Sequence, residues 1–273
     1  HGNLALHPTK QCNFMQECYF VSSGSQTITS NGNPYGIGTL QSFSGGGEFT
    51  IQDDCTFGQV ILDAATLDFN NKNITALTFT SSNANVRTLK LGSGTFTLTS
   101  NTAQKFWDCS TPTNMTLDAS TSTIKSTSNS IQLNAFLGGG LTYYNVWFTG
   151  TNTSKMTISG SNTFHNLKDD RSVNRSIEFT AGTTQTISSI SLNGTSSQGL
   201  TLKSTTNGST WSISGGSGYH SVNAVTIQDS VAIGGATFVA FSSIDNGNNS
   251  GWEFITPSLS DISSLTNIQS ITI

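Results

Sequence analysis

The sequence is short of charged side chains and prolines. Of its 273 residues, 10% are charged, against about 25% in a typical soluble domain, and 4 are Pro. Ser, Thr, Asn and Gly are abundant instead and Thr, Ile, Val and Phe recur, so the composition favours strands over helices. The 16 Phe and 4 Trp argue against a disordered chain, because disorder usually comes with few aromatic residues and a high net charge.

These shortages exclude several classes of partner. The net charge is −4 and the 11 basic residues are scattered along the chain, whereas a nucleic-acid-binding surface needs clustered Lys and Arg. No apolar run approaches the ~20 residues of a membrane-spanning helix. We therefore expect neither a nucleic-acid partner nor insertion into a membrane.

Cysteine is scarce as well. The four cysteines, Cys12, Cys18, Cys55 and Cys109, are too few for a disulfide framework. Cys12 and Cys18 could pair, although free or buried thiols are the simpler interpretation. No His follows them at the spacing of zinc ligands, so we expect no metal site and no cofactor.

From about residue 57 onward, short runs alternate apolar residues with Thr, Ser or Lys. Residues 66–69, 156–159 and 200–203 are examples, and such runs begin roughly every 10 to 15 residues. A period of two indicates half-buried strands. Two or three such strands would make one turn of a coil, which gives a loose repeat in the range of repeat architectures.

We therefore predict an all-β fold, a single-stranded right-handed parallel β-helix over residues 57–256. Residues 1–56 are predicted to form an irregular N-terminal cap or attachment segment, because residues 45–47 are all Gly and residues 31–34 resemble a turn. Residues 257–273 are expected to form a C-terminal tail. A β-sandwich is the alternative, since it also has regularly spaced short strands.

Several stretches resemble a known kind of protein. These are GGGLTYYN at 138–145, GSNTFHNL at 160–167 and FTAGTTQT at 179–186. They are similar to Thr/Ser/Gly-rich β-solenoid proteins of phage and environmental genomes, which are described as tail-fibre, spike or surface proteins. The resemblance covers roughly residues 60–255 and implies a parallel β-helix in a virion appendage or a secreted surface protein. It carries no catalytic residues.

The richest aromatic stretch lies at residues 143–148. In a regular strand, Tyr143, Asn145 and Trp147 face one side and Tyr144 faces the other. The first three are our candidate glycan-binding residues, as an aromatic platform for sugar rings. The alternative is that these aromatic residues fill the core or a subunit interface.

Acidic clusters suggest a second possibility, a spike that degrades glycans with paired carboxylates. The densest cluster is Lys168-Asp169-Asp170-Arg171, with Glu178 nearby, and Asp53-Asp54 form another pair. Neighbouring residues of a strand point to opposite faces, and such clusters are common in solvated loops. We therefore predict no catalytic residues and no enzymatic activity.

The function expected from the sequence is that of a structural and adhesive virion component, such as a tail fibre, a spike or a capsid-attached fibre of a bacteriophage. The resemblance implies a homotrimer, and the N-terminal segment would attach it to other virion proteins. A glycan on the host surface is a candidate partner. The alternatives are a glycan-degrading tailspike and a secreted bacterial surface adhesin.

Overall fold

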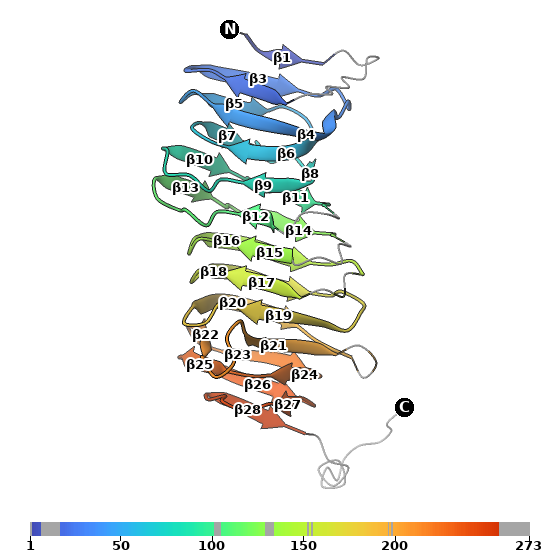
Figure 1. The fold of residues 1–273 in the computed structure, drawn as a ribbon, viewed down its shortest axis with the longest axis vertical. Helices are drawn as coiled ribbons and strands as arrows, with labels where there is room; N and C mark the ends of the chain where they lie inside the picture. The colour runs from blue at the N-terminus through green and yellow to red at the C-terminus, as the bar shows by residue number, and fades with distance from the viewer. Residues whose placement is uncertain are drawn as a thin grey trace.

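The computed structural model describes residues 2–6, 17–100, 105–128, 134–151, 153, 155–195, 197 and 199–256. The chain is all-β and winds into a β-solenoid of about 10 turns, a rod with its coils stacked along the long axis (Figure 1). Every strand pairing between the described residues is parallel. This confirms the predicted parallel β-helix and excludes the β-sandwich, whose sheets are antiparallel.

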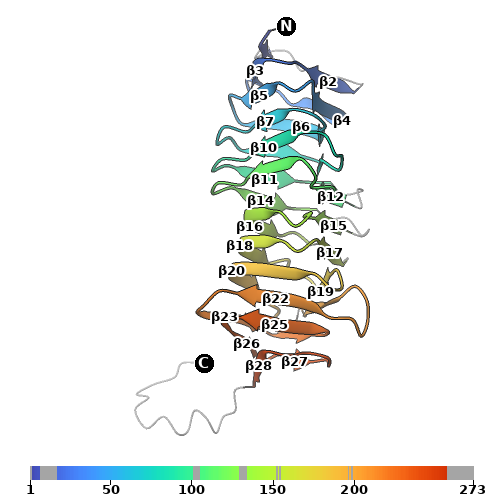
Figure 2. The same cartoon turned by 90° about the vertical axis from the view of Figure 1, so that its left-hand side faces the viewer.

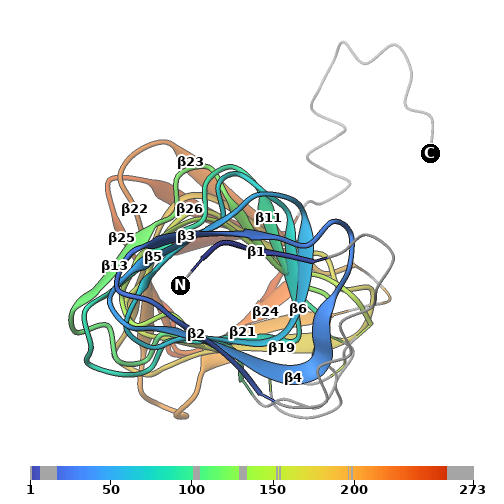
Figure 3. The same cartoon turned by 90° about the horizontal axis from the view of Figure 1, so that it is seen from above.

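Each coil contributes strands to the faces of the rod, and the strands of one face stack on one another along the rod (Figures 2 and 3). The first face consists of β1 (Leu4–Ala5), β3 (Ser25–Thr29), β5 (Glu48–Ile51), β7 (Thr66–Asp68), β10 (Arg87–Lys90) and β13 (Met115–Asp118). The second face consists of β2 (Cys18–Val21), β4 (Tyr35–Ser44), β6 (Cys55–Leu62), β9 (Thr78–Thr80), β12 (Lys105–Asp108), β15 (Asn134–Leu137), β17 (Met156–Ser159), β19 (Arg175–Phe179), β21 (Leu200–Ser204), β24 (Val225–Ile227) and β27 (Ile244–Asp245).

The third face is joined to the second because β6 pairs with strands of both. It consists of β8 (Ile74–Ala76), β11 (Thr95–Leu98), β14 (Thr123–Ser126), β16 (Thr142–Phe148), β18 (Thr163–Asp169), β20 (Thr184–Leu192), β22 (Trp211–Gly215) and β25 (Ser230–Gly234). A small separate sheet lies near the C-terminal end of the rod. It consists of β23 (Tyr219–Asn223), β26 (Thr237–Phe241) and β28 (Trp252–Ile255).

The core is a stack of apolar side chains along the axis of the rod. The inward residue of each strand lies directly above its partner in the next coil, so that like side chains stack. Phe79, Trp107 and Phe136 are in register on the second face and are fully buried. The ring centroids of Phe79 and Trp107 are 4.5 Å apart, and those of Trp107 and Phe136 are 5.9 Å apart. The period-two pattern thus places one apolar rung inside the rod at each turn.

Two glycines show how closely the coils approach one another at the turns. A Cβ atom on Gly94 would lie 2.2 Å from the carbonyl oxygen of Lys72 in the preceding coil. On Gly251 it would lie 2.0 Å from the carbonyl oxygen of Ala232, and Gly251 also has a φ of +74°. Only glycine fits at such a contact without displacing backbone.

The predicted irregular cap over residues 1–56 is wrong for the described part of that segment. Strands β1 to β5 belong to the solenoid, and β3 pairs with β5, which pairs with β7. The predicted boundary falls inside β6. The glycines at 45–47 form a tight turn between coils, since a Cβ on Gly47 would lie 2.4 Å from the carbonyl oxygen of Gly24. The predicted tail at 257–273 lies outside the described residues, as does Cys12, whereas Cys18 has a free, half-buried thiol.

Candidate binding surface

The strand β16 carries the three candidate glycan-binding residues, and it bends at a corner between two faces. Tyr143, Val146 and Phe148 are buried, whereas the consecutive residues Tyr144 and Asn145 both point outward. The bend shifts the phase of the alternation by one residue. The prediction that Tyr143 shares an outer face with Asn145 and Trp147 is therefore wrong, because Tyr143 lies in the core.

Tyr143 takes part in a buried hydrogen-bonded group. Its hydroxyl donates to the carbonyl of Gly138 at 2.7 Å and accepts from Trp107 Nε1 at 3.1 Å. Burial raises the pKa of Tyr143 well above its usual value, and the neighbouring Cys109 adds to the effect. The neutral phenol thus satisfies two buried polar groups, one as donor and one as acceptor, which is a structural role.

Trp147 lies on the outer face between two lysines. In the ladder, Lys125 precedes Trp147 and Lys168 follows it, and each ammonium nitrogen lies 4.2 Å from the ring centroid. These are cation–π contacts on both sides of the indole. Both ring faces are therefore occupied, so Trp147 does not offer the flat platform for a sugar ring that was expected of it.

Asp170 contacts both Trp147 and Lys168. It accepts from Trp147 Nε1 at 2.8 Å and forms an ion pair with Lys168 at 3.1 Å. Burial alone would raise the pKa of Asp170, but hydrogen bonds from Trp147, Lys168 and Thr149 and the charge of Lys168 lower it below its usual value. The carboxylate is ionised at neutral pH and fixes the orientation of the indole ring.

Asn145 belongs to a polar ladder at the corner. It is in register with Thr123 in the preceding coil and Asn166 in the following one. Its Nδ2 atom donates to Thr123 Oγ1 at 3.2 Å. It is outward, as predicted, although its amide is engaged with a neighbouring rung.

Sequence reasoning missed the aromatic pair at the same corner. The rings of Tyr144 and His165 stack with centroids 4.1 Å apart and an interplanar angle of 7°. The signal was present, because aligning residues 142–145 with residues 163–166 places Tyr144 opposite His165. Without the register of the coils, the two motifs could not be superposed.

The acidic candidates have structural partners rather than one another. Asp169 is buried and pairs with Arg171 and Arg175 at 2.6 and 2.7 Å, whereas Asp170 is on the outer face. The expected solvated loop is thus wrong for Asp169 and Arg171. Glu178 lies between two lysines, at 2.8 Å from Lys155 and 3.3 Å from Lys203.

Asp53 and Asp54 stabilise turns through hydrogen bonds to their carboxylates. The carboxylate of Asp53 accepts from the backbone amides of Ser30 and Asn31 at 2.7 and 2.6 Å. Asp54 accepts from the backbone and side-chain amides of Asn73 at 2.8 and 3.0 Å, and these hydrogen bonds lower its pKa. Both residues link one coil to the next.

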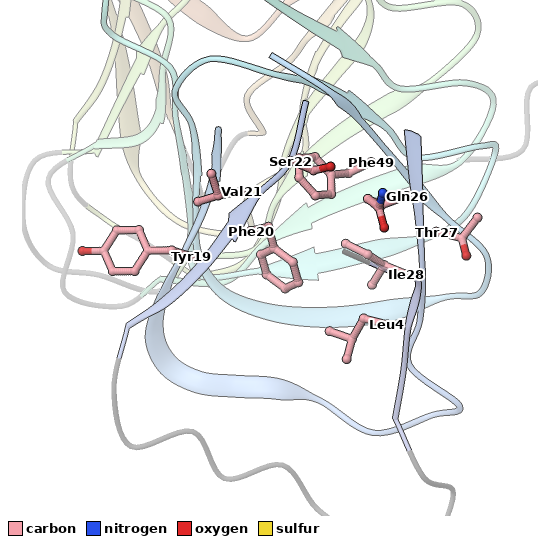
Figure 4. Close-up of a pocket in the computed structure, with 10 residues that line it drawn as sticks. Leu4, Tyr19, Phe20, Val21, Ser22, Gln26, Thr27, Ile28 and Phe49 are labelled. Carbon is pink, nitrogen blue, oxygen red and sulfur yellow. The ribbon is translucent and has the colours of Figure 1, made fainter. Parts of the chain in front are cut away.

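A hollow of about 310 Å³ lies at the N-terminal end of the rod (Figure 4). Leu4, Phe20 and Ile28 point into it, and Tyr19 points away from it. Tyr19 is 62% exposed. The side-chain oxygen of Gln26, which also lines the hollow, is buried and has no hydrogen-bond partner in the part of the chain that the structure describes.

Comparison of the chain with models of protein families, with curated proteins and with solved structures gives no match. Across the described ranges, no group of three or more His, Cys, Asp or Glu is placed to hold a metal ion. In the same ranges no helix is long and apolar enough to cross a membrane.

Proposed function

We propose that the protein is a stiff structural and adhesive rod, a component of a virion appendage that contacts glycans on a host surface. The observation that supports this most directly is the stack of coils, whose second face and apolar core run the length of the molecule. A parallel solenoid is suited to this task, because each coil is held by hydrogen bonds and buried side chains of both neighbours.

The N-terminal end of the rod is the proposed point of attachment to other virion proteins. There β1 pairs only with β3, and β2 only with β4, among the strands that the structure describes. Such edges pair readily with another strand. The hollow at this end and its Gln26 oxygen, which has no hydrogen-bond partner among the described residues (Figure 4), also favour contact with a further protein segment.

Adhesion would occur along the sides of the rod, at the corner of β16 where Tyr144 stacks on His165. We propose a homotrimer, which would present this corner three times. Weak contacts repeated in this way bind far more strongly than a single contact. Light scattering of the purified chain tests the trimer, and a monomer at micromolar concentration would contradict it.

We further propose that the rod has no glycan-degrading activity, because the acidic residues that could form a catalytic pair are each held in ion pairs or turn contacts. A reducing-sugar assay on host envelope glycans tests this. Turnover by the wild-type chain that Asp170→Ala abolishes would overturn the proposal in favour of a tailspike enzyme.

Two measurements test the main proposal. Mass spectrometry of purified virus particles from the source material should detect this chain, and its detection only in bacterial envelopes would favour a secreted adhesin instead. Labelled protein should bind host cells and should lose that binding after mild periodate oxidation of surface glycans. Binding that survives oxidation would contradict the glycan contact.

A further inference from the structure

The first face of the solenoid is interrupted part-way along the rod. Phe49, Leu67 and Leu89 occupy successive rungs of this face and are at most 3% exposed. Leu117 is next in register but is only half-buried. The reason is that β13 is the last strand of this sheet among the described residues, so no described strand is hydrogen-bonded to its far edge.

A groove of about 360 Å³ opens at this interruption. One side comes from β13 and the turn that follows it, with Leu117, Asp118 and Ser120. The other side comes from β16, β18 and β20, with Tyr144, His165 and Ser188. This volume is at the lower end of the range for small-molecule sites, about 300–1,000 Å³.

The aromatic side of the groove is held in place by the stacked pair. The ring of His165 lies parallel to that of Tyr144 at 4.1 Å. The residue that follows His165 in the ladder is Ser188, whose side chain is small and exposed. The pair therefore projects from the wall as a fixed aromatic shelf, not as two independent side chains.

The opposite side supplies hydrogen-bonding groups. The exposed carboxylate of Asp118 accepts one bond from the Ser120 amide at 3.1 Å, and an ionised carboxylate can accept about four. The hydroxyls of Ser120, Thr163 and Ser188 also line the groove. No Lys or Arg is among the lining residues, so the charge in the groove is that of one carboxylate.

We infer that this groove binds a short neutral saccharide, with one hexopyranose ring against the Tyr144–His165 shelf. A pyranose has an apolar C–H face suited to an aromatic ring and a rim of hydroxyls suited to carboxylate and hydroxyl partners. The Asp118 carboxylate disfavours acidic sugars. The inference rests on the proposed adhesive function and names the ligand class and the residues that bind it.

The test is binding of the full chain to an immobilised panel of oligosaccharides. The panel holds neutral members built from glucose, galactose, mannose and N-acetylglucosamine, and matched uronic acid and sialylated members. The wild-type chain should bind neutral members preferentially. Tyr144→Ala and Asp118→Asn should each weaken this binding by about tenfold or more, while Tyr144→Phe should retain it because the ring remains.

The matched control is Tyr219→Ala, which removes a tyrosine that is 56% exposed on β23, outside the groove. It should bind as the wild type does. Far-UV circular dichroism of each variant shows whether it is folded. A Tyr144→Ala variant that fails to fold is replaced by His165→Ser, which removes half of the shelf and should also weaken binding.

Four results would overturn the inference, and they can be distinguished from failure of the proposed function. If the wild type binds the panel and the groove variants bind equally well, the groove is wrong but glycan adhesion stands. Loss of binding in Trp147→Ala alone would also contradict the groove and leave glycan adhesion intact. A preference for acidic members would contradict the neutral saccharide and likewise leave adhesion intact. If labelled protein binds host cells but no panel member, the saccharide class is wrong. If it does not bind cells, the adhesive proposal fails as well.

Discussion

The neighbouring residues Asp169 and Asp170 allow a direct comparison of a buried and an exposed carboxylate. The side chains of Asp169, Arg171 and Arg175 are at most 2% exposed. Asp169 accepts from Nε and Nη2 of Arg171 at 2.9 and 2.6 Å and from Nε of Arg175 at 2.7 Å. The side chain of Asp170 is 40% exposed and pairs with Lys168.

Asp169→Asn keeps the shape of the side chain but removes the charge that balances two buried guanidinium groups. Removing one partner of a buried ion pair typically costs about 3–5 kcal/mol of unfolding free energy, because a charge remains buried without compensation. Asp170→Asn removes the same charge from the outer face, where a pair is worth about 1 kcal/mol or less. Each variant changes the net charge equally, so the difference between them reports the surroundings of the two carboxylates, one buried with two arginines and one exposed beside a lysine.

The assay is urea unfolding, followed by tryptophan fluorescence and far-UV circular dichroism. Because a solenoid can unfold in sections, hydrogen exchange of residues 163–179 should be measured as well. We expect Asp169→Asn to unfold at a lower urea concentration and to exchange faster in this segment. A loss below about 1 kcal/mol, or one equal to that of Asp170→Asn, would refute the assigned role of the cluster.

Further expectations follow from the core, one buried histidine and the N-terminal edge. Trp107→Ala should lower the unfolding free energy by about 3–5 kcal/mol, whereas the exposed Val86→Ala should change it by about 0.5 kcal/mol or less, both measured by urea unfolding. Burial lowers the pKa of His220, so the unfolded chain takes up its proton at a higher pH than the folded chain does. The stability from neutral His220 is present above about pH 6.5 and is lost as the pH falls toward the folded pKa. The wild-type melting temperature should therefore drop more between pH 7.5 and pH 5.0 than that of His220→Gln. Val21→Lys places a charge on the edge strand β2, where the native side chain is 63% exposed. This variant should show less concentration-dependent association in light scattering than the wild type, because a charge on an edge strand opposes pairing with another strand. Association equal to that of the wild type would argue against pairing at this edge.

Most of the strands could be predicted from the sequence, because the inward position of a half-buried strand needs an apolar residue at every second place. Met156 and Ile158 illustrate this, with both side chains buried and Thr157 between them half-buried. The N-terminal coils were missed because glycines were interpreted as irregular chain. Gly45 and Gly47 are instead required by the close approach of the preceding coil, and Gly46 has a φ of +80°.

The candidate site was harder to predict, because it depends on where the chain turns corners. A regular alternation places Tyr143 with Asn145, but the bend after Tyr143 turns two successive residues outward. The position of a bend depends on contacts with the coils on either side, and these require the register. The burial of Asp169 was missed for a similar reason, since its partners Arg171 and Arg175 reach it only after the chain turns back.

The architecture itself accounts for the scarcity of charge. In a parallel sheet in register, each outward side chain lies about 4.8 Å from its equivalents in the coils above and below, and like charges in such positions are destabilising. Where charges do occur they alternate in sign, as where Lys90 contacts Glu48 and Asp68.

In the ladder of Lys125, Trp147 and Lys168, repulsion between like charges is avoided in a different way. Trp147 separates the two lysines by one coil and accepts a cation–π contact from each. Thr, Ser and Asn avoid the problem altogether, since their hydroxyls and amides can hydrogen-bond along a ladder without repulsion. A polar, weakly charged composition is therefore what stacking of coils demands, and it carries little information about the partner. The information about a ligand should instead be sought where the stacking is interrupted, as it is at the end of the first face.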